Sequence, residues 1–124
     1  MIKSSSKVIV TFFNHVNLSV TVKPVIIMST YPNKKSLEKI ANQLVKNKLA
    51  ACVNIFKIYS IYSWKGKIEK TPEYIALFKT TQRKKKQLKE KIKETHPYKV
   101  PEIVELNVNS INKPYLSWLI ESTL

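Results

Sequence analysis

The chain has 124 residues, of which 22 are Lys or Arg and eight are acidic, so its formal net charge is +14. This length suits one domain, and a hydrophobic content of 44% is enough to build a packed core. With one Cys, one Gly and no Asp, the sequence excludes a disulfide framework, a single-chain structural zinc site, a calcium loop and the glycine-rich phosphate loops.

The positive charge has two interpretations. A net charge of +14 is typical of proteins that bind nucleic acid or an anionic membrane. It also arises where Lys is simply abundant, and here Lys is spread along most of the chain. Dispersed charge favours the second interpretation, so we expect no specific nucleic-acid partner.

Residues 1–24 are predicted to be an extension to a single domain at 25–124. The apolar stretch Val8–Phe13 is too short to span a bilayer, which takes about 20 residues, so no membrane span is expected. The Ser run and the lack of acidic residues suit an organelle-targeting segment. The alternation of apolar and polar residues over Val16–Val22 suits an added strand equally well. We expect a cytoplasmic protein unless residues 1–24 direct it to an organelle.

The domain is predicted to begin with a strand and a helix. The short apolar run Val25–Thr30 predicts the strand. The segment Lys34–Lys48 has the apolar spacing of an amphipathic helix, with one face turned toward a core.

A long hairpin is predicted next. Ala50–Trp64 is rich in β-branched and aromatic residues and predicts a strand. Lys65 and Gly66 supply the turn, and Lys67–Thr80 returns as the second arm. Pro72 lies inside that arm, where proline predicts either a bulge or an edge position.

Three further elements complete the chain. A helix is predicted over Gln82–Thr95, with Thr80 and Thr81 as candidate caps for its first free N–H groups. The alternation over Glu102–Val108 predicts a strand, and Pro114 suits the first turn of a final helix.

The order β-α-β-β-α-β-α predicts an α+β protein with a ferredoxin-like, antiparallel sheet and helices on one face. The opposite face of such a sheet is usually polar. Here Val25–Met28 and Tyr74–Phe78 are apolar at consecutive positions, so both faces of their strands are apolar. We therefore expect the second face to be covered, by the terminal helix and the extension or by another subunit in a closed oligomer.

Cys52 and His96 carry the side chains best suited to chemistry. Cys52 can be a small buried hydrophobe, a nucleophile activated by a neighbouring cation, or a soft ligand that binds copper together with a His. His96 begins a loop stiffened by Pro97 and Pro101, and a stiff loop positions its side chains well. It can line a pocket, bind a metal or satisfy the carbonyl groups at the end of the preceding helix.

Two surface features have simpler interpretations. Trp64, with Tyr59 and Tyr62, marks the hairpin tip, where aromatic residues favour an interface over a cofactor site. The basic run Arg83–Lys93 favours a solvated helix face over a nucleic-acid site, because an RNA-binding sheet of this class needs a glycine-containing aromatic motif that the chain lacks.

Four motifs in the same order make residues 25–124 resemble the CutA divalent-cation-tolerance family. Apolar strand segments, the hairpin tip and the proline-rich loop all contribute to this likeness. The motifs are Leu49-Ala50-Ala51-Cys52-Val53-Asn54, Ser60-Ile61-Tyr62-Ser63-Trp64-Lys65-Gly66-Lys67-Ile68-Glu69, Lys79-Thr80-Thr81 and His96-Pro97-Tyr98-Lys99-Val100-Pro101-Glu102-Ile103; the closing Tyr115-Leu116-Ser117-Trp118-Leu119 fits too.

The resemblance implies a ferredoxin-like fold and a homotrimer in which long hairpins reach neighbouring subunits. Members of the family are linked to tolerance of divalent metals, and some bind copper. The architecture is also similar to nitrogen-regulatory signalling proteins, which bind small effectors between subunits. No catalytic reaction follows from the likeness, so we expect no enzyme.

The metal ligands of the family are only partly present. Some bacterial members have a Cys where this chain has Ser29, and a second His where it has Thr95. His96 therefore remains, with Cys52 as the other soft ligand for copper or another divalent cation. The resemblance also implies an intersubunit effector site, whose matching residues are Trp64, Glu69, Lys79, Tyr98 and Glu102. A metal-responsive trimer and a metal-free, small-molecule-sensing trimer both stay open.

Overall fold

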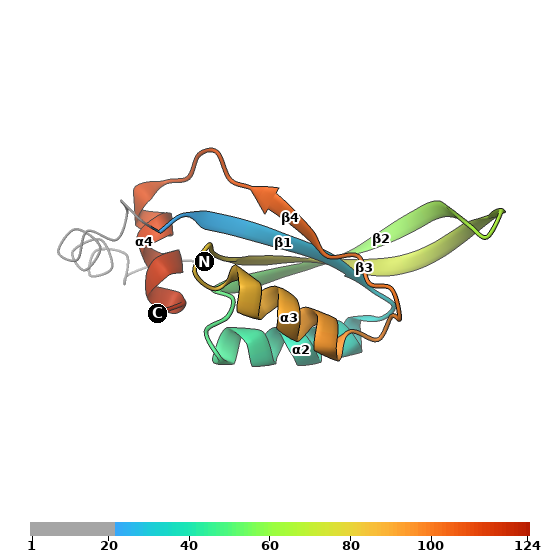
Figure 1. The fold of residues 1–124 in the computed structure, drawn as a ribbon, viewed down its shortest axis with the longest axis horizontal. Coiled ribbons are helices and arrows are strands. Elements are labelled where there is room, and N and C mark those ends of the chain that lie inside the picture. Colours follow the sequence, from blue (N-terminus) through green and yellow to red (C-terminus); the bar gives the residue numbers. More distant parts are fainter. Residues whose placement is uncertain (1–21) are drawn as a thin grey trace.

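The computed structural model describes residues 22–124, and its elements follow the predicted order. They form an α+β domain with a four-stranded antiparallel sheet in the order β2-β3-β1-β4. The elements are β1 (Pro24–Tyr31), α2 (Lys34–Lys46), β2 (Cys52–Trp64), β3 (Lys67–Thr81), α3 (Lys85–Thr95), β4 (Val104–Asn107) and α4 (Lys113–Ser122). Helices α2 and α3 lie on the same face of the sheet, while α4 lies at one end of it (Figure 1).

Most of the predicted extension at 1–24 lies outside the described residues, and so do its two interpretations as a targeting segment or an added strand. Of that segment, Val22 is buried and packs with Ile120 of α4. Strand β1 begins two residues after Val22, at Pro24.

Helix α2 forms as predicted, two residues shorter at its end. The side chain of Asn33 accepts a hydrogen bond from the backbone N–H of Ser36 (2.8 Å) and caps the helix start. Lys48 has a positive φ of 62°, a conformation that does not continue a helix. The buried side of α2 is Leu37, Ile40, Ala41 and Leu44.

The predicted start of the next helix is wrong. Helix α3 begins at Lys85, and its N-cap Lys84 makes no side-chain capping hydrogen bond. Thr80 and Thr81 belong instead to β3, which pairs with β1 as far as Pro24 opposite Thr81. The hydroxyl of Thr80 donates to the carbonyl of Leu49 (2.7 Å) rather than capping a helix.

The core lies between the sheet and helices α2 and α3. Alternate residues of β1 and β3 face it, so that Val25, Ile27 and Phe78 are completely buried. Leu88 and Ile92 of α3 close the core from the helix side.

The opposite face of the sheet is apolar and partly exposed, as the consecutive apolar runs predict. Phe56 is 46% exposed, and Val104 and Leu106 of β4 are 37% and 36% exposed. In the described part of the chain, α4 contacts β3 at one end of this sheet. What covers the remainder stays a prediction.

The hairpin extends well beyond the sheet. Strands β2 and β3 keep one continuous register from Cys52 opposite Lys79 to Trp64 opposite Lys67, while β1 pairs with β3 only from Tyr74 onward. The remainder of the hairpin projects as a two-stranded ribbon (Figure 1). Of the two predictions for Pro72, the edge position is confirmed, because the register through it contains no bulge and β1 does not reach it.

The turn of the ribbon uses the chain's single glycine. Lys65 and Gly66 both have positive φ, 51° and 77°. Two consecutive residues of that kind match the right-handed twist of the flanking strands, and glycine accepts this conformation without steric cost.

Candidate functional site

His96 lies directly after α3 and contacts Ser29, Tyr98 and Tyr31. Its Nε2 is 3.1 Å from the hydroxyl oxygen of Ser29, and its Nδ1 accepts a hydrogen bond from the backbone N–H of Tyr98 (3.0 Å). Its ring stacks on Tyr31, with the ring centroids 4.2 Å apart. Because the N–H of Tyr98 points at Nδ1, that nitrogen carries no proton, and the proton of the neutral ring lies on Nε2, facing Ser29.

Burial controls the charge of this cluster. It lowers the pKa of His96 from 6.5, and a backbone hydrogen bond with Thr30 acts in the opposite direction. The ring is therefore neutral at pH 7. Burial also raises the pKa of Tyr31 to about 12, with the hydroxyl of Ser29 opposing it.

Tyr98 connects the loop to the base of the ribbon. Its hydroxyl donates a 2.6 Å hydrogen bond to Oε2 of Glu73, a side chain that is only 8% exposed. Burial, followed by this hydrogen bond, raises the pKa of Tyr98 well above its usual value. Ser29, His96, Tyr98 and Glu73 thus form a connected series of contacts from β1 to β3.

The other predicted site residues near the ribbon and the loop at 96–102 are more exposed than Glu73. Trp64 lies at the ribbon tip, 53% exposed, with the ammonium group of Lys65 5.9 Å from its ring centroid. Glu69 pairs in register with Tyr62. Glu102 is exposed and makes no hydrogen bond or ion pair within the described part of the chain.

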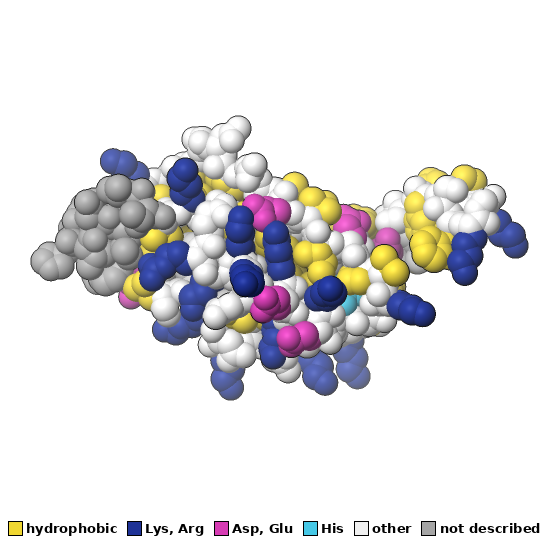
Figure 2. Space-filling view, viewed as in Figure 1, with side chains coloured by type: hydrophobic (Ala, Val, Ile, Leu, Met, Phe, Trp, Pro, Cys, Tyr) yellow, Lys and Arg dark blue, Asp and Glu magenta, His cyan; other side chains and the backbone are white. Residues whose placement is uncertain are grey.

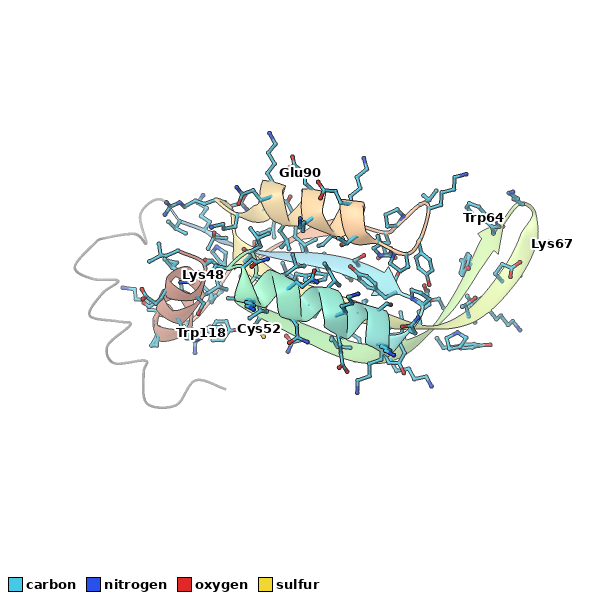
Figure 3. The ribbon with its side chains drawn as sticks, turned by 90° about the horizontal axis from the view of Figure 1, so that it is seen from below. Lys48, Cys52, Trp64, Lys67, Glu90 and Trp118 are labelled. Carbon is cyan, nitrogen blue, oxygen red and sulfur yellow. The ribbon has the colours of Figure 1, made fainter. Side chains whose placement is uncertain are left out.

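Lys79 and Cys52 lie at the other end of the sheet. They are register partners, and the ammonium group of Lys79 is 3.4 Å from the hydroxyl of Tyr115 and 5.6 Å from its ring centroid. Figure 3 shows Cys52 at the end where Trp118 of α4 lies and Trp64 at the far tip of the ribbon. Twelve steps along β2 separate Cys52 from Trp64, roughly 40 Å of extended chain.

His96 and Cys52 are not brought together within one chain. Ser29, which contacts His96, is completely buried on the helix-covered face of β1. Cys52 is in register with Lys79, and Lys79 with Ile26, whose side chain points to the opposite face from that of Ser29 because successive residues alternate. A metal site that uses both residues would therefore need two chains.

The described residues of a single chain do not fit a resident metal ion. Within 22–124 there is no group of three or more His, Cys, Asp or Glu side chains that could hold one. Both ring nitrogens of His96 are already engaged by Tyr98 and Ser29.

The basic surface is dispersed and partly neutralised. Figure 2 shows Lys and Arg side chains distributed over the body and the ribbon on the visible face. Two lysines of α3, Lys85 and Lys89, bind the carboxylate of Glu105 from both sides, and these hydrogen bonds lower its pKa. Among residues 22–124, no helix has the length and apolar character to cross a membrane.

Sequence reasoning missed Glu73 and Tyr31. Each borders an apolar strand segment. Glu73 precedes Tyr74–Phe78, and Tyr31 follows Val25–Thr30. An acidic residue beside an apolar strand run, in a chain with eight acids, is the signal that could have identified Glu73.

The sequence and fold are similar to those of known proteins. The family described as "CutA1 divalent ion tolerance protein" matches residues 25–122. The divalent-cation tolerance protein CutA of Pyrococcus horikoshii is 43% identical over 99 residues, 80% of this chain and 97% of that protein. Protein CutA, chloroplastic, of Arabidopsis thaliana is 38% identical over 122 residues, 98% of this chain and 67% of that protein. The structure of the periplasmic divalent cation tolerance protein CutA of Archaeoglobus fulgidus is 36% identical, with a TM-score of 0.79 over 82% of this chain and 99% of that one.

Proposed function

The chain belongs to the CutA1 divalent ion tolerance family, and from that membership we propose that it is a non-enzymatic homotrimer that acts in the response to divalent metal ions. Its ligand site lies between subunits, where the loop at 96–102 of one chain meets a ribbon. The observation that carries this proposal is the hydrogen bond between Tyr98 and Glu73, which fixes that loop to the ribbon base.

Exposed apolar surface supports the trimer. An isolated two-stranded ribbon is marginally stable in water, yet this one exposes Tyr59 (63%), Ile61 (62%) and Ile68 (67%). A partner that covers the ribbon and the second sheet face removes this surface from water. We also propose that the strand order, with α2 and α3 on one face, is the ferredoxin-like arrangement.

Light scattering at micromolar concentration tests the assembly. The expected mass is three times the chain mass of 14.4 kDa. A mass near that of one chain contradicts the trimer and, with it, any site between subunits.

A small effector suits this site better than a metal ion. Tyr98, Glu73, Glu69 and Trp64 offer a phenol, two carboxylates and an indole, groups that hydrogen-bond and stack on an organic molecule. Lys79 and Glu102 were predicted for the same site. Lys79 lies near α4, so it contributes to such a site only from a neighbouring subunit.

Copper or another divalent cation at His96 and Cys52 is the second candidate, favoured by the descriptor of the family. It requires His96 from one subunit and Cys52 from another.

Thermal-shift screening of the trimer against divalent cations and small organic metabolites separates the two candidates. A ligand present at a hundredfold excess over its Kd stabilises the folded state by about 2.7 kcal/mol. Stabilisation by metabolites alone supports the effector; stabilisation by cations that is lost in both His96→Ala and Cys52→Ala supports the metal.

Location in the cell is also a proposal. Relatives include a protein named as chloroplastic and one named as periplasmic. The match to the Arabidopsis protein extends over 98% of this chain and so takes in most of residues 1–24. We propose that this segment decides between the cytoplasm and an organelle. Fluorescent fusions with and without residues 1–21 are expected to differ in location; identical locations contradict the proposal.

A further inference from the structure

The imidazole of His96 has no lone pair left for a metal ion. A histidine that binds a metal does so through an unprotonated ring nitrogen and donates the proton of the other nitrogen to a neighbour. Here the unprotonated nitrogen is Nδ1, and the backbone N–H of Tyr98 already points at it from 3.0 Å. The protonated nitrogen is Nε2, which faces the hydroxyl of Ser29 at 3.1 Å.

Neither nitrogen is easily released. Binding through Nδ1 requires the N–H of Tyr98 to move away and lose its acceptor. Binding through Nε2 requires the ring proton to move to Nδ1, where it would point at the N–H of Tyr98, so two donors would face each other. The stacked ring of Tyr31 keeps the imidazole from turning to a third orientation.

We infer that His96 is a positioning residue for Tyr98 and not a metal ligand, which argues against the second candidate above. The contact from Nδ1 to the N–H two residues later has the geometry of an Asx-turn, in which a side-chain acceptor holds the backbone. It sets the loop so that the hydroxyl of Tyr98 meets Glu73. All these contacts lie within one chain, so the inference depends neither on the trimer nor on the effector.

Metal binding by matched variants tests whether His96 is a ligand. All variants carry Cys52→Ser, which removes the thiol, and all are full-length. Co²⁺ titration followed by visible absorption compares this background with the same chain carrying His96→Gln. Because neither ring nitrogen of His96 is available, we expect the two chains to bind Co²⁺ equally, within about twofold. Clearly weaker binding by His96→Gln overturns the inference.

The protonation of the His96 ring is measured by ¹⁵N NMR of the full-length Cys52→Ser chain, and His96→Gln is used to assign the ring signals. One protonated and one unprotonated ring nitrogen are expected, and equimolar Zn²⁺ should leave both shifts unchanged. A shift of either nitrogen with Zn²⁺ makes His96 a ligand and rejects the inference.

The positioning role has its own readout. The amide proton of Tyr98 should keep its hydrogen-bonded chemical shift in His96→Asn, whose side-chain oxygen can replace Nδ1, and should move upfield in His96→Ala. If His96→Ala leaves this amide and the carboxylate signal of Glu73 unchanged, His96 does not position Tyr98. Light scattering on the same samples reports the assembly separately, so a failure of the trimer is distinguished from a failure of this inference.

Discussion

The hydroxyl of Tyr98 donates a 2.6 Å hydrogen bond to the carboxylate of Glu73, 25 residues earlier in the chain. Glu73 is 8% exposed, so this donor satisfies an acidic group that would otherwise be buried without a partner. The contact also joins the proline-stiffened loop to the strand from which the ribbon projects.

Loss of that donor should destabilise the fold. Tyr98→Phe removes only the hydroxyl and leaves the buried carboxylate of Glu73 unsatisfied, so we expect the free energy of unfolding to fall by about 1–3 kcal/mol. Urea unfolding measures it. The matched control is Tyr98→Phe in a Glu73→Gln chain, where the buried charge is gone and the same substitution should cost less. Equal effects of Tyr98→Phe in the two backgrounds contradict a stabilising role for the Tyr98–Glu73 bond.

His96 should make stability depend on pH. Its pKa in the folded chain lies below 6.5, so the unfolded chain binds more protons as the pH falls below that value. The stabilising contribution is therefore fully present above pH 6.5 and is lost as the pH falls through the folded pKa of His96. Thermal unfolding midpoints at pH 5 and pH 7.5 should differ more in the parent chain than in His96→Asn. A variant with the same pH dependence as the parent would show that another group is responsible.

Glu105 should stabilise the attachment of α3 to β4 through its two lysines. We expect Glu105→Gln to lower the unfolding midpoint more than Glu90→Gln, which removes the same charge from an exposed position of α3. The difference should shrink in 1 M salt, because salt screens ion pairs near the surface. If the difference persists at high salt, charge is not its cause.

The second sheet face should be the trimer interface. Val104→Asp places a charge among apolar side chains of that face and is expected to reduce the mass in light scattering to that of one chain. Val45→Asp is the control, since Val45 is 41% exposed on α2, which lies on the other face of the sheet, and it should leave the mass unchanged. Circular dichroism checks that both variants fold. A folded Val104→Asp variant that keeps the full mass excludes this face as the interface.

The sequence alone was enough to predict the order of elements, because apolar residues recur every two positions in the strands and every three or four in the helices. It could not predict where α3 begins. Thr80 and Thr81 are good caps locally, but pairing of β3 with β1 extends through both of them, and this tertiary contact determines their conformation.

The candidate site was predictable in part for a similar reason. Pro97 and Pro101 revealed a stiff loop, and so Tyr98 and His96 were identified. Glu73 was not, because its partner arrives from a distant segment. Cys52 and His96 lie on opposite faces of the sheet, which could be inferred only from the strand register. A shift of the register by one residue would reverse the face of every side chain in the strand.

The edge position of Pro72 has a consequence for solubility. The ribbon combines exposed apolar side chains with unpaired strand edges, the combination that recruits foreign strands and leads to fibres. Pro72 has no N–H, so a strand docking along that stretch of β3 finds a donor missing from the ladder it would extend. Pro72 therefore opposes the addition of a foreign strand along that part of β3.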